Sequence, residues 1–144
     1  MEEALSQARQ AGEAGEIAVG AVIARRGTII ARAGNTKEAK HDATCHAEIN
    51  VIREASQQLK RWRLEDCTLY VTLEPCIMCA GAILAARIPH VVFGAWDEKA
   101  GAVGSQFDIL RERRLNHQVE VKAGVMEHEC TQLLHSFFQD LRQS

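Results

Sequence analysis

The chain has 144 residues, 47% of them hydrophobic, and a formal net charge of −2. This length is typical of one domain, which buries about two thirds of its unfolded surface without needing disulfide bonds. With 17 basic and 19 acidic side chains, the protein has no overall positive field for a polyanion, so nucleic-acid binding would need a local patch. No apolar run reaches the roughly 18 residues of a membrane span, and we expect no membrane partner.

The cysteine usage indicates a reducing compartment. Five cysteines are an odd number, and their spacing differs from the paired framework of small secreted domains. Residues 1–16 mix acids with Ala and Gln instead of forming a basic and apolar leader. We therefore expect a soluble, cytoplasmic protein in which Cys45, Cys67 and Cys130 are buried and inert.

A helix and a hairpin are the first elements predicted along the chain. Residues 2–14 are rich in Ala, Gln, Glu and Leu, and Gly15 is suited to end a helix there. Residues 19–24 and 28–31 are strand-like, and the short connection at 25–27 contains a glycine that favours a hairpin.

The middle of the chain predicts two helices separated by a strand. Apolar residues recur at three- and four-residue steps after residue 46, residues 68–72 are strand-like, and residues 76–87 are again helical, with Pro75 suited to the first turn. The predicted apolar positions of the first helix are Ile49, Ile52, Ala55 and Leu59. Along one side of the second helix the prediction places Ile77, Ala80, Leu84 and Arg87.

The last third of the chain completes an alternating pattern. Residues 91–95 and 118–122 are strand-like, and residues 127–141 are predicted to form the final helix. Strands that alternate with helices indicate an α/β layer architecture. Because no repeat, linker or low-complexity run divides the sequence, we expect a single domain over residues 1–144.

Two short motifs carry the predicted chemistry. His46, Ala47 and Glu48 form an H-x-E sequence, and Cys76 and Cys79 belong to a P-C-x-x-C sequence. With the histidine and the two cysteines as ligands, zinc keeps its fourth tetrahedral position for water, which is typical of a catalytic site. The combination of the two motifs is the signature of the zinc nucleobase deaminases.

The spacing of the motifs also predicts where they lie. Side chains two apart on a helix face different directions, so His46 and Glu48 converge only on an object beyond the helix end. We therefore place them in or near the first turn, with Asp42 or Thr44 as the candidate cap. The two cysteines are one turn apart at the start of the next helix, where the helix dipole favours thiolates. Two helix starts are thus predicted to meet at one zinc ion.

The predicted reaction is hydrolytic deamination. Zinc acidifies its bound water, Glu48 accepts the proton, and the hydroxide attacks the amidine carbon of a ring such as adenine or cytosine. Glu48 then protonates the departing amine, which leaves as ammonia. A C-x-x-C redox pair and a non-catalytic zinc module are the alternatives, although neither needs a proton shuttle. The other histidines have no companion at a metal-ligand spacing: His41, His90, His117, His128 and His135.

A longer stretch of sequence extends both motifs. Residues 69–82, which read LYVTLEPCIMCAGA, continue through residues 87–95 and closely resemble bacterial tRNA-specific adenosine deaminases of the cytidine deaminase superfamily. The likeness covers nearly the whole chain. It implies a three-layer α/β/α cytidine-deaminase-like fold with a central mixed sheet of about five strands. It also implies conversion of the wobble adenosine of a tRNA anticodon to inosine by a zinc-bearing homodimer.

The resemblance also assigns site residues. Glu48 corresponds to the family's proton shuttle, Asn35 to the asparagine that holds the flipped nucleotide, and Asn116 to another asparagine near the anticodon loop. From the residues alone, both asparagines would be predicted to lie in turns. The implied substrate-binding residues are Val19, Asn35, Ala47, Asp97 and Asn116.

The substrate stays open in two respects. A deaminase of a free base or nucleoside, such as guanine, cytosine or cytidine, is the nearest alternative and is favoured by the mild acidity. Single-stranded DNA is another, because only a few hydroxyl contacts distinguish the two sugars. Trp96 stands where the family commonly has a basic or small residue, and its ring either stacks on a base or narrows the entrance. Trp62, by contrast, is expected to pack against the protein.

Overall fold

A computed structural model describes residues 1–143. Its elements follow the predicted alternation, with one short helix added after the first hairpin. In chain order they are α1 (Glu2–Glu13), β1 (Gly20–Arg25), β2 (Thr28–Gly34), α2 (Lys37–Lys40), α3 (Ala47–Leu59), β3 (Cys67–Leu73), α4 (Ile77–Ala85), β4 (His90–Ala95), β5 (Glu120–Lys122) and α5 (Glu127–Gln143).

The strands form one five-stranded sheet in the order β2-β1-β3-β4-β5. β1 pairs antiparallel with β2 and β3, whereas β3 pairs parallel with β4, and β4 with β5. The β1–β2 turn places Arg26 and Gly27 at positive φ (53° and 78°), as a two-residue hairpin turn requires. The predicted mixed sheet of about five strands is confirmed.

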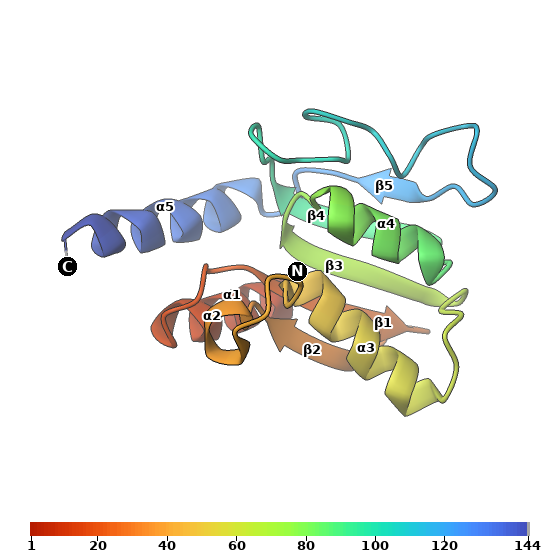
Figure 1. The fold of residues 1–144 in the computed structure, drawn as a ribbon, viewed down its shortest axis with the longest axis horizontal. Helices are drawn as coiled ribbons and strands as arrows, with labels where there is room; N and C mark the ends of the chain where they lie inside the picture. The colour runs from red at the N-terminus through yellow and green to blue at the C-terminus, as the bar shows by residue number, and fades with distance from the viewer. Residues whose placement is uncertain (144) are drawn as a thin grey trace.

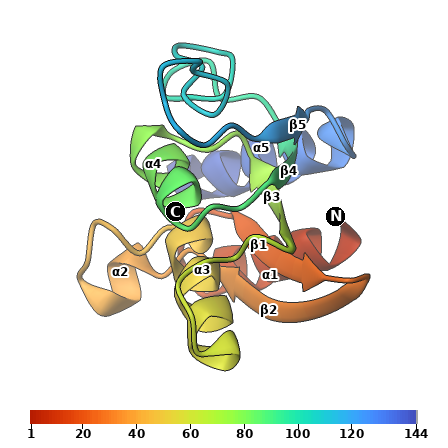
Figure 2. The ribbon, with the colours of Figure 1, turned by 90° about the vertical axis from the view of Figure 1, so that its right-hand side faces the viewer.

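Helices cover both faces of this sheet (Figures 1 and 2). α3 and α4 pack together on one face, and α1 and α5 pack together on the other. The parallel pair β3 and β4 lies between these layers, so its apolar side chains, such as Leu69, Val71 and Phe93, are fully buried. The predicted α/β/α architecture in three layers is therefore confirmed.

The buried faces of α3 and α4 differ in part from the predicted ones. α3 buries Ala47, Glu48, Val51 and Ala55, and the predicted Ile52 and Leu59 are partly buried against the core. The predicted stripe is wrong at Ile49, which is partly buried without packing against that core. The predicted side of α4 is wrong at Ile77, which is 53% exposed, because this helix packs on the core through Cys79, Ala80 and Ile83. In α4 every residue is apolar or glycine, so periodicity could not reveal which side faces the core.

Two further features concern helices. α2 has no buried residue, which explains why its sequence KEAK gave no apolar period to predict it. Among residues 1–143, none of the helices has the length and apolar character needed to cross a membrane.

Candidate active site

His46 is placed by the start of α3. It is the residue before the helix, with an extended backbone (φ −68°, ψ 155°), and Glu48 is the second helical residue. The predicted caps, Asp42 and Thr44, are wrong because they bond to each other: Asp42 Oδ1 accepts hydrogen bonds from the Thr44 N–H and hydroxyl. The extended backbone before α3 allows His46 to turn across the helix end, which a helical residue could not do.

Cys76 occupies the same position at the start of α4. It precedes the helix with an extended backbone (φ −79°, ψ 179°), and Cys79 follows in the first turn. Pro75 therefore lies before the helix, and its predicted place in the first turn is wrong. α3 and α4 pack against each other. The expected meeting of two helix starts is confirmed.

The three predicted ligands converge. The Nδ1 atom of His46 lies 3.7 Å from Cys76 Sγ and 3.5 Å from Cys79 Sγ. All three ligand atoms lie within 4.8 Å of one another, and within residues 1–143 no other group of His, Cys, Asp and Glu side chains has this arrangement.

These distances fit zinc. Bonds of about 2.0 Å to nitrogen and about 2.3 Å to sulfur, at a tetrahedral angle, place the two atoms about 3.5 Å apart. One imidazole and two thiols are typical zinc ligands, and three of them leave a fourth position open. The site therefore has the chemistry and the spacing of a catalytic zinc centre.

The two thiols differ in acidity. Hydrogen bonds from Cys79 and His46 lower the pKa of Cys76 to about 4, although burial opposes them. The pKa of Cys79 is raised, first because it donates to Cys76 and then because it is buried. The hydrogen bond to Cys76 also raises the pKa of His46. Cys76 is thus a ready thiolate, while Cys79 has to lose a proton when a metal binds.

Glu48 lies beside this cluster inside the protein. Its side chain is buried, which raises its pKa to about 7, and the negative charge of Cys76 acts in the same direction. A pKa near neutrality suits a group that both accepts and donates a proton. A bound zinc cation would act in the opposite direction and favour the carboxylate.

A pocket of about 160 Å³ opens beside Glu48. Four of the five predicted substrate-binding residues line it: Val19, Asn35, Ala47 and Asp97. The fifth, Asn116, does not line it and is exposed in the segment before β5. The complete lining is Ile17, Val19, Asn35, His46, Ala47, Glu48, Leu73, Glu74, Cys76, Asp97 and Ala100.

Both polar substrate-binding candidates in the pocket are held in turns. Asn35 Oδ1 accepts a hydrogen bond from the Lys37 N–H at 2.9 Å. Asp97 Oδ1 accepts from the N–H groups of Lys99 and Ala100, both at 3.2 Å. These bonds fix the two side chains but leave the Asn35 amide nitrogen and the second Asp97 oxygen for a ligand.

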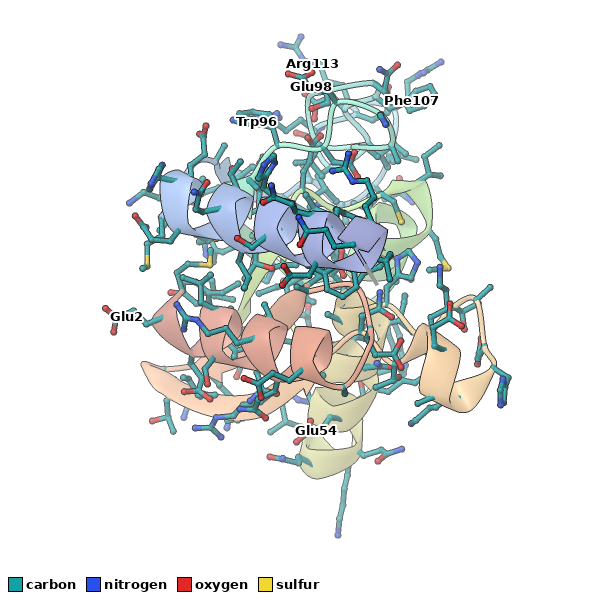
Figure 3. All side chains as sticks on the ribbon, turned by 90° about the vertical axis from the view of Figure 1, so that its left-hand side faces the viewer. Glu2, Glu54, Trp96, Glu98, Phe107 and Arg113 are labelled. Atoms are coloured by element: carbon teal, nitrogen blue, oxygen red, sulfur yellow. The ribbon has the colours of Figure 1, made fainter. Side chains whose placement is uncertain are left out.

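Trp96 stands outside the pocket, on the exposed segment that follows β4. It is 43% exposed, and its ring packs perpendicular to that of Phe93, with centroids 4.9 Å apart. Figure 3 shows Trp96 and Phe107 on opposite sides of this segment, which lies above α5. Trp96 is not among the residues that line the pocket beside Glu48.

Other sequence predictions are settled by burial. Cys45, Cys67 and Cys130 are free and buried, as expected. His117 hydrogen-bonds with the Ile88 carbonyl, which fits its prediction as a hydrogen-bonded residue. Trp62 does not pack as expected, because it is 58% exposed.

Two buried acids beside the pocket were missed by sequence analysis. Glu16 and Glu74 are 3% and 2% exposed, and both accept hydrogen bonds from backbone N–H groups of distant segments. Burial raises the pKa of Glu74, but the hydrogen bonds from Ser105, Asp97 and Val103 outweigh it, so the net pKa is lowered. The sequence signal for Glu74 was an acid directly after an apolar strand, which is not specific, and Glu16 lies in the connection between α1 and β1 without any such signal.

The whole chain was compared with known proteins. A model of the MafB19-like deaminases matches residues 1–142. The tRNA-specific adenosine deaminase of Bacillus subtilis (strain 168) is 51% identical over 143 residues, which cover 99% of this chain and 89% of that protein. This chain belongs to the deaminase family.

Solved structures of other deaminases have the same cytidine-deaminase-like fold. This deaminase is similar, with a TM-score of 0.89 and 46% identity, to a structure from a study of A-to-I editing by tRNA:A34 deaminases at the wobble position of transfer RNA, over 92% of this chain and 96% of the other. A guanine deaminase from Bacillus subtilis is 34% identical, with a TM-score of 0.65, over 99% and 91% of the two chains.

Proposed function

We propose that this deaminase converts the wobble adenosine of a tRNA anticodon to inosine by zinc-dependent hydrolysis, as a single domain over residues 1–144. The observation that carries this proposal is the cluster of His46, Cys76 and Cys79 beside a buried Glu48. The substrate follows from the high identity to tRNA-specific adenosine deaminases over nearly full length.

The three clustered ligands would hold the zinc. When bound, zinc lowers the pKa of a coordinated water and supplies a nucleophile at neutral pH. Glu48 would accept a proton from the attacking water at its carboxylate and deliver it to the amine of carbon 6 of the adenine ring, which leaves as ammonia. Its burial supports this role, because burial raises the pKa of Glu48 to about 7, where the carboxyl can both accept and donate a proton.

The pocket walls would hold the base. The free amide nitrogen of Asn35 is a donor for the ring or its sugar, and the second oxygen of Asp97 is an acceptor for a hydroxyl. Val19 and Ala47 are small apolar walls that leave room for a flat ring. The space of about 160 Å³ suits one flipped base and little more. Asn116, which is outside the pocket, would contact RNA beyond that base.

The direct test is inosine formation in a tRNA anticodon stem-loop. Zinc-loaded protein should convert it, and Glu48→Ala should lose the activity while its zinc content stays unchanged. Activity retained by Glu48→Ala would contradict the assignment of Glu48. A DNA stem-loop of the same sequence, assayed in parallel, decides whether the 2′-hydroxyl is required.

A second candidate function is deamination of guanine or another free base. The 34% identity to a guanine deaminase supports it, because the same pocket position could hold either purine. Ammonia release from guanine, cytosine or cytidine with an untouched stem-loop would establish this function instead.

We further propose that the protein is a homodimer through the exposed side of α4. A helix that is apolar all round is normally buried, yet Ile77, Gly81 and Ala85 are exposed and lie one turn apart. Ala85 also lines a hollow of about 430 Å³ between α3 and α4, whose lining includes the exposed ring of Trp62. The lining residues are Ile49, Ile52, Arg53, Ser56, Trp62, Ala82, Ala85 and Ala86.

Sedimentation measures the oligomeric state directly. Ile77→Asp should shift a dimer to a monomer, since a charge would be buried at the interface. Phe107→Asp, at an equally exposed residue on the segment after β4, is the control and should leave the dimer intact. A monomeric parent protein would refute the proposed dimer.

We propose that the protein acts in the cytoplasm, where free thiols and tRNA substrates occur together.

A further inference from the structure

Two buried carboxylates hold two segments at the pocket wall, α2 beside Asn35 and residues 97–105, which include Asp97 and Ala100. Glu16 is next to Ile17, which lines the pocket, and Glu74 follows Leu73, which also lines it. Neither acid forms an ion pair in the part of the chain that the structure describes; each binds backbone N–H groups instead.

Glu16 holds α2. Its Oε1 accepts a hydrogen bond from the Glu38 N–H at 2.9 Å, and its Oε2 accepts from the Ala39 N–H at 2.8 Å. α2 begins two residues after Asn35, and the Asn35 side chain accepts a hydrogen bond from the first N–H of that helix, at Lys37. The position of the Asn35 amide is therefore set by α2, and that of α2 by Glu16.

Glu74 holds residues 97–105, the second of these two segments. Its Oε1 accepts hydrogen bonds from the Asp97 N–H at 3.0 Å and from the Ser105 hydroxyl. Its Oε2 accepts from the N–H groups of Val103 and Ser105, both at 3.0 Å. The carboxylate thus closes residues 97–105 into a loop around itself.

The backbone of residues 97–105 packs closely against the Glu74 carboxylate. A Cβ atom on Gly101 would collide with the Glu74 carboxylate. The neighbouring Pro75 carbonyl accepts a further bond from the Ala102 N–H at 2.8 Å. Asp97 and Ala100, the two pocket residues of this loop, are therefore fixed to the same strand end that carries Cys76.

Although Glu74 borders the pocket, its acceptor capacity is used. A carboxylate offers about four lone-pair positions, and the four hydrogen bonds to residues 97–105 occupy them. Glu74 is thus unsuited to accept a proton or a substrate hydrogen bond. Glu48, by contrast, has no such set of donors around it.

We infer that Glu16 and Glu74 are positioning residues that set the separation of the two pocket walls, and with it the affinity for the flipped nucleotide. The inference rests on the proposed deaminase function. It predicts that loosening either wall weakens substrate binding more than the chemical step, because the zinc ligands and Glu48 lie at the starts of α3 and α4 and not on α2 or residues 97–105.

Glu74→Gln tests the inference. The amide keeps one oxygen and turns an NH₂ group toward N–H donors, so at least two of the four donors lose their acceptor. We expect KM for the stem-loop to rise by about tenfold or more while kcat changes by less than about threefold. Ser105→Ala removes one donor only and should give a smaller rise in KM. Glu16→Gln should raise KM in the same way.

A matched control separates positioning from stability. Leu64→Ala creates a cavity near the start of β3, at the other end of the sheet, and should lower the melting temperature without raising KM. Binding is also measured without turnover, by comparing the affinity of Glu48→Ala and of Glu48→Ala with Glu74→Gln for the same RNA.

The possible results are distinct. If the parent protein forms no inosine, the proposed function fails. If the parent is active and Glu74→Gln, Ser105→Ala and Glu16→Gln all keep its KM and affinity, the inference is overturned. If Glu74→Gln does not fold, the KM and affinity of Ser105→Ala and Glu16→Gln still test whether the two carboxylates position the pocket. A rise in KM for Leu64→Ala as large as that for Glu74→Gln would also overturn the inference.

Discussion

The Nδ1 atom of His46 lies 3.5 Å from the sulfur of Cys79, although 33 residues separate them in the chain. Cys79→Ser should therefore lose bound zinc, from about one ion per chain to near zero, because it replaces a soft ligand. Metal analysis of purified protein measures this. Cys130→Ala, which removes the buried thiol of α5 outside the metal cluster, is the control and should keep its zinc. Full zinc occupancy in Cys79→Ser would contradict the proposed ligand set.

Glu48→Gln should lower kcat by about 10²- to 10⁴-fold, because the amide cannot carry a proton between water and amine. The stem-loop should still bind, since the amide has nearly the same shape. Single-turnover assays at saturating RNA separate the two effects. A variant that loses affinity but keeps kcat would assign Glu48 to binding instead.

Trp96→Ala is expected to weaken binding of the stem-loop by about 1–3 kcal/mol, or roughly 5- to 150-fold in affinity, because a neighbouring base loses the exposed ring on which it stacks. Trp96→Phe should retain most of the affinity. Phe107→Ala is the control, because Phe107 is 55% exposed on the other side of the same segment. Unchanged affinity in Trp96→Ala would exclude stacking.

Gly20→Ala should destabilise the protein by at least about 2 kcal/mol. A Cβ atom there would collide with the backbone of Ala4 and Ala8 in α1, which cannot move aside as a side chain can. Gly81→Ala, where a Cβ atom meets nothing within 4 Å, should instead raise stability by roughly 0.5–1 kcal/mol. Denaturant unfolding measures both, with sedimentation to exclude changes in association.

The hydrogen bond from Arg25, assisted by Arg61, lowers the pKa of Asp66 to about 2, below the ordinary value of 3.8. The ion pairs of Asp66 with Arg25 and Arg61 therefore stabilise the folded protein above pH 4, and this contribution is lost as the pH falls toward 2. Because Asp66 is about one third exposed, Asp66→Asn should cost about 1 kcal/mol or less at pH 7.

Stability measured against pH tests this sign. The difference between Asp66→Asn and the parent protein should shrink between pH 4 and pH 2. Glu65→Gln, which removes a more exposed ion pair with Arg63, is the control and should have a smaller effect. A difference that grows on acidification would contradict the assignment.

Much of the fold and the metal cluster could be predicted because the signals are local. The alternation of strands and helices, the two motifs and their places at helix starts all lie within stretches of a few residues. The errors were local too. Which side of α4 faces the core could not be read from nine residues that are apolar or glycine, and Ile77 was misplaced for that reason.

The sequence by itself determined the chemistry of this protein: a histidine, two cysteines and a glutamate at helix starts indicate a zinc-dependent proton transfer. Only the tertiary structure decided which side chains shape the pocket. It placed Asn116 outside, and it used Glu16 and Glu74 to hold α2 and residues 97–105, which are more than 20 residues away. Hydrogen bonds across such distances leave no period or spacing in a sequence, because the fold alone brings donor and acceptor together.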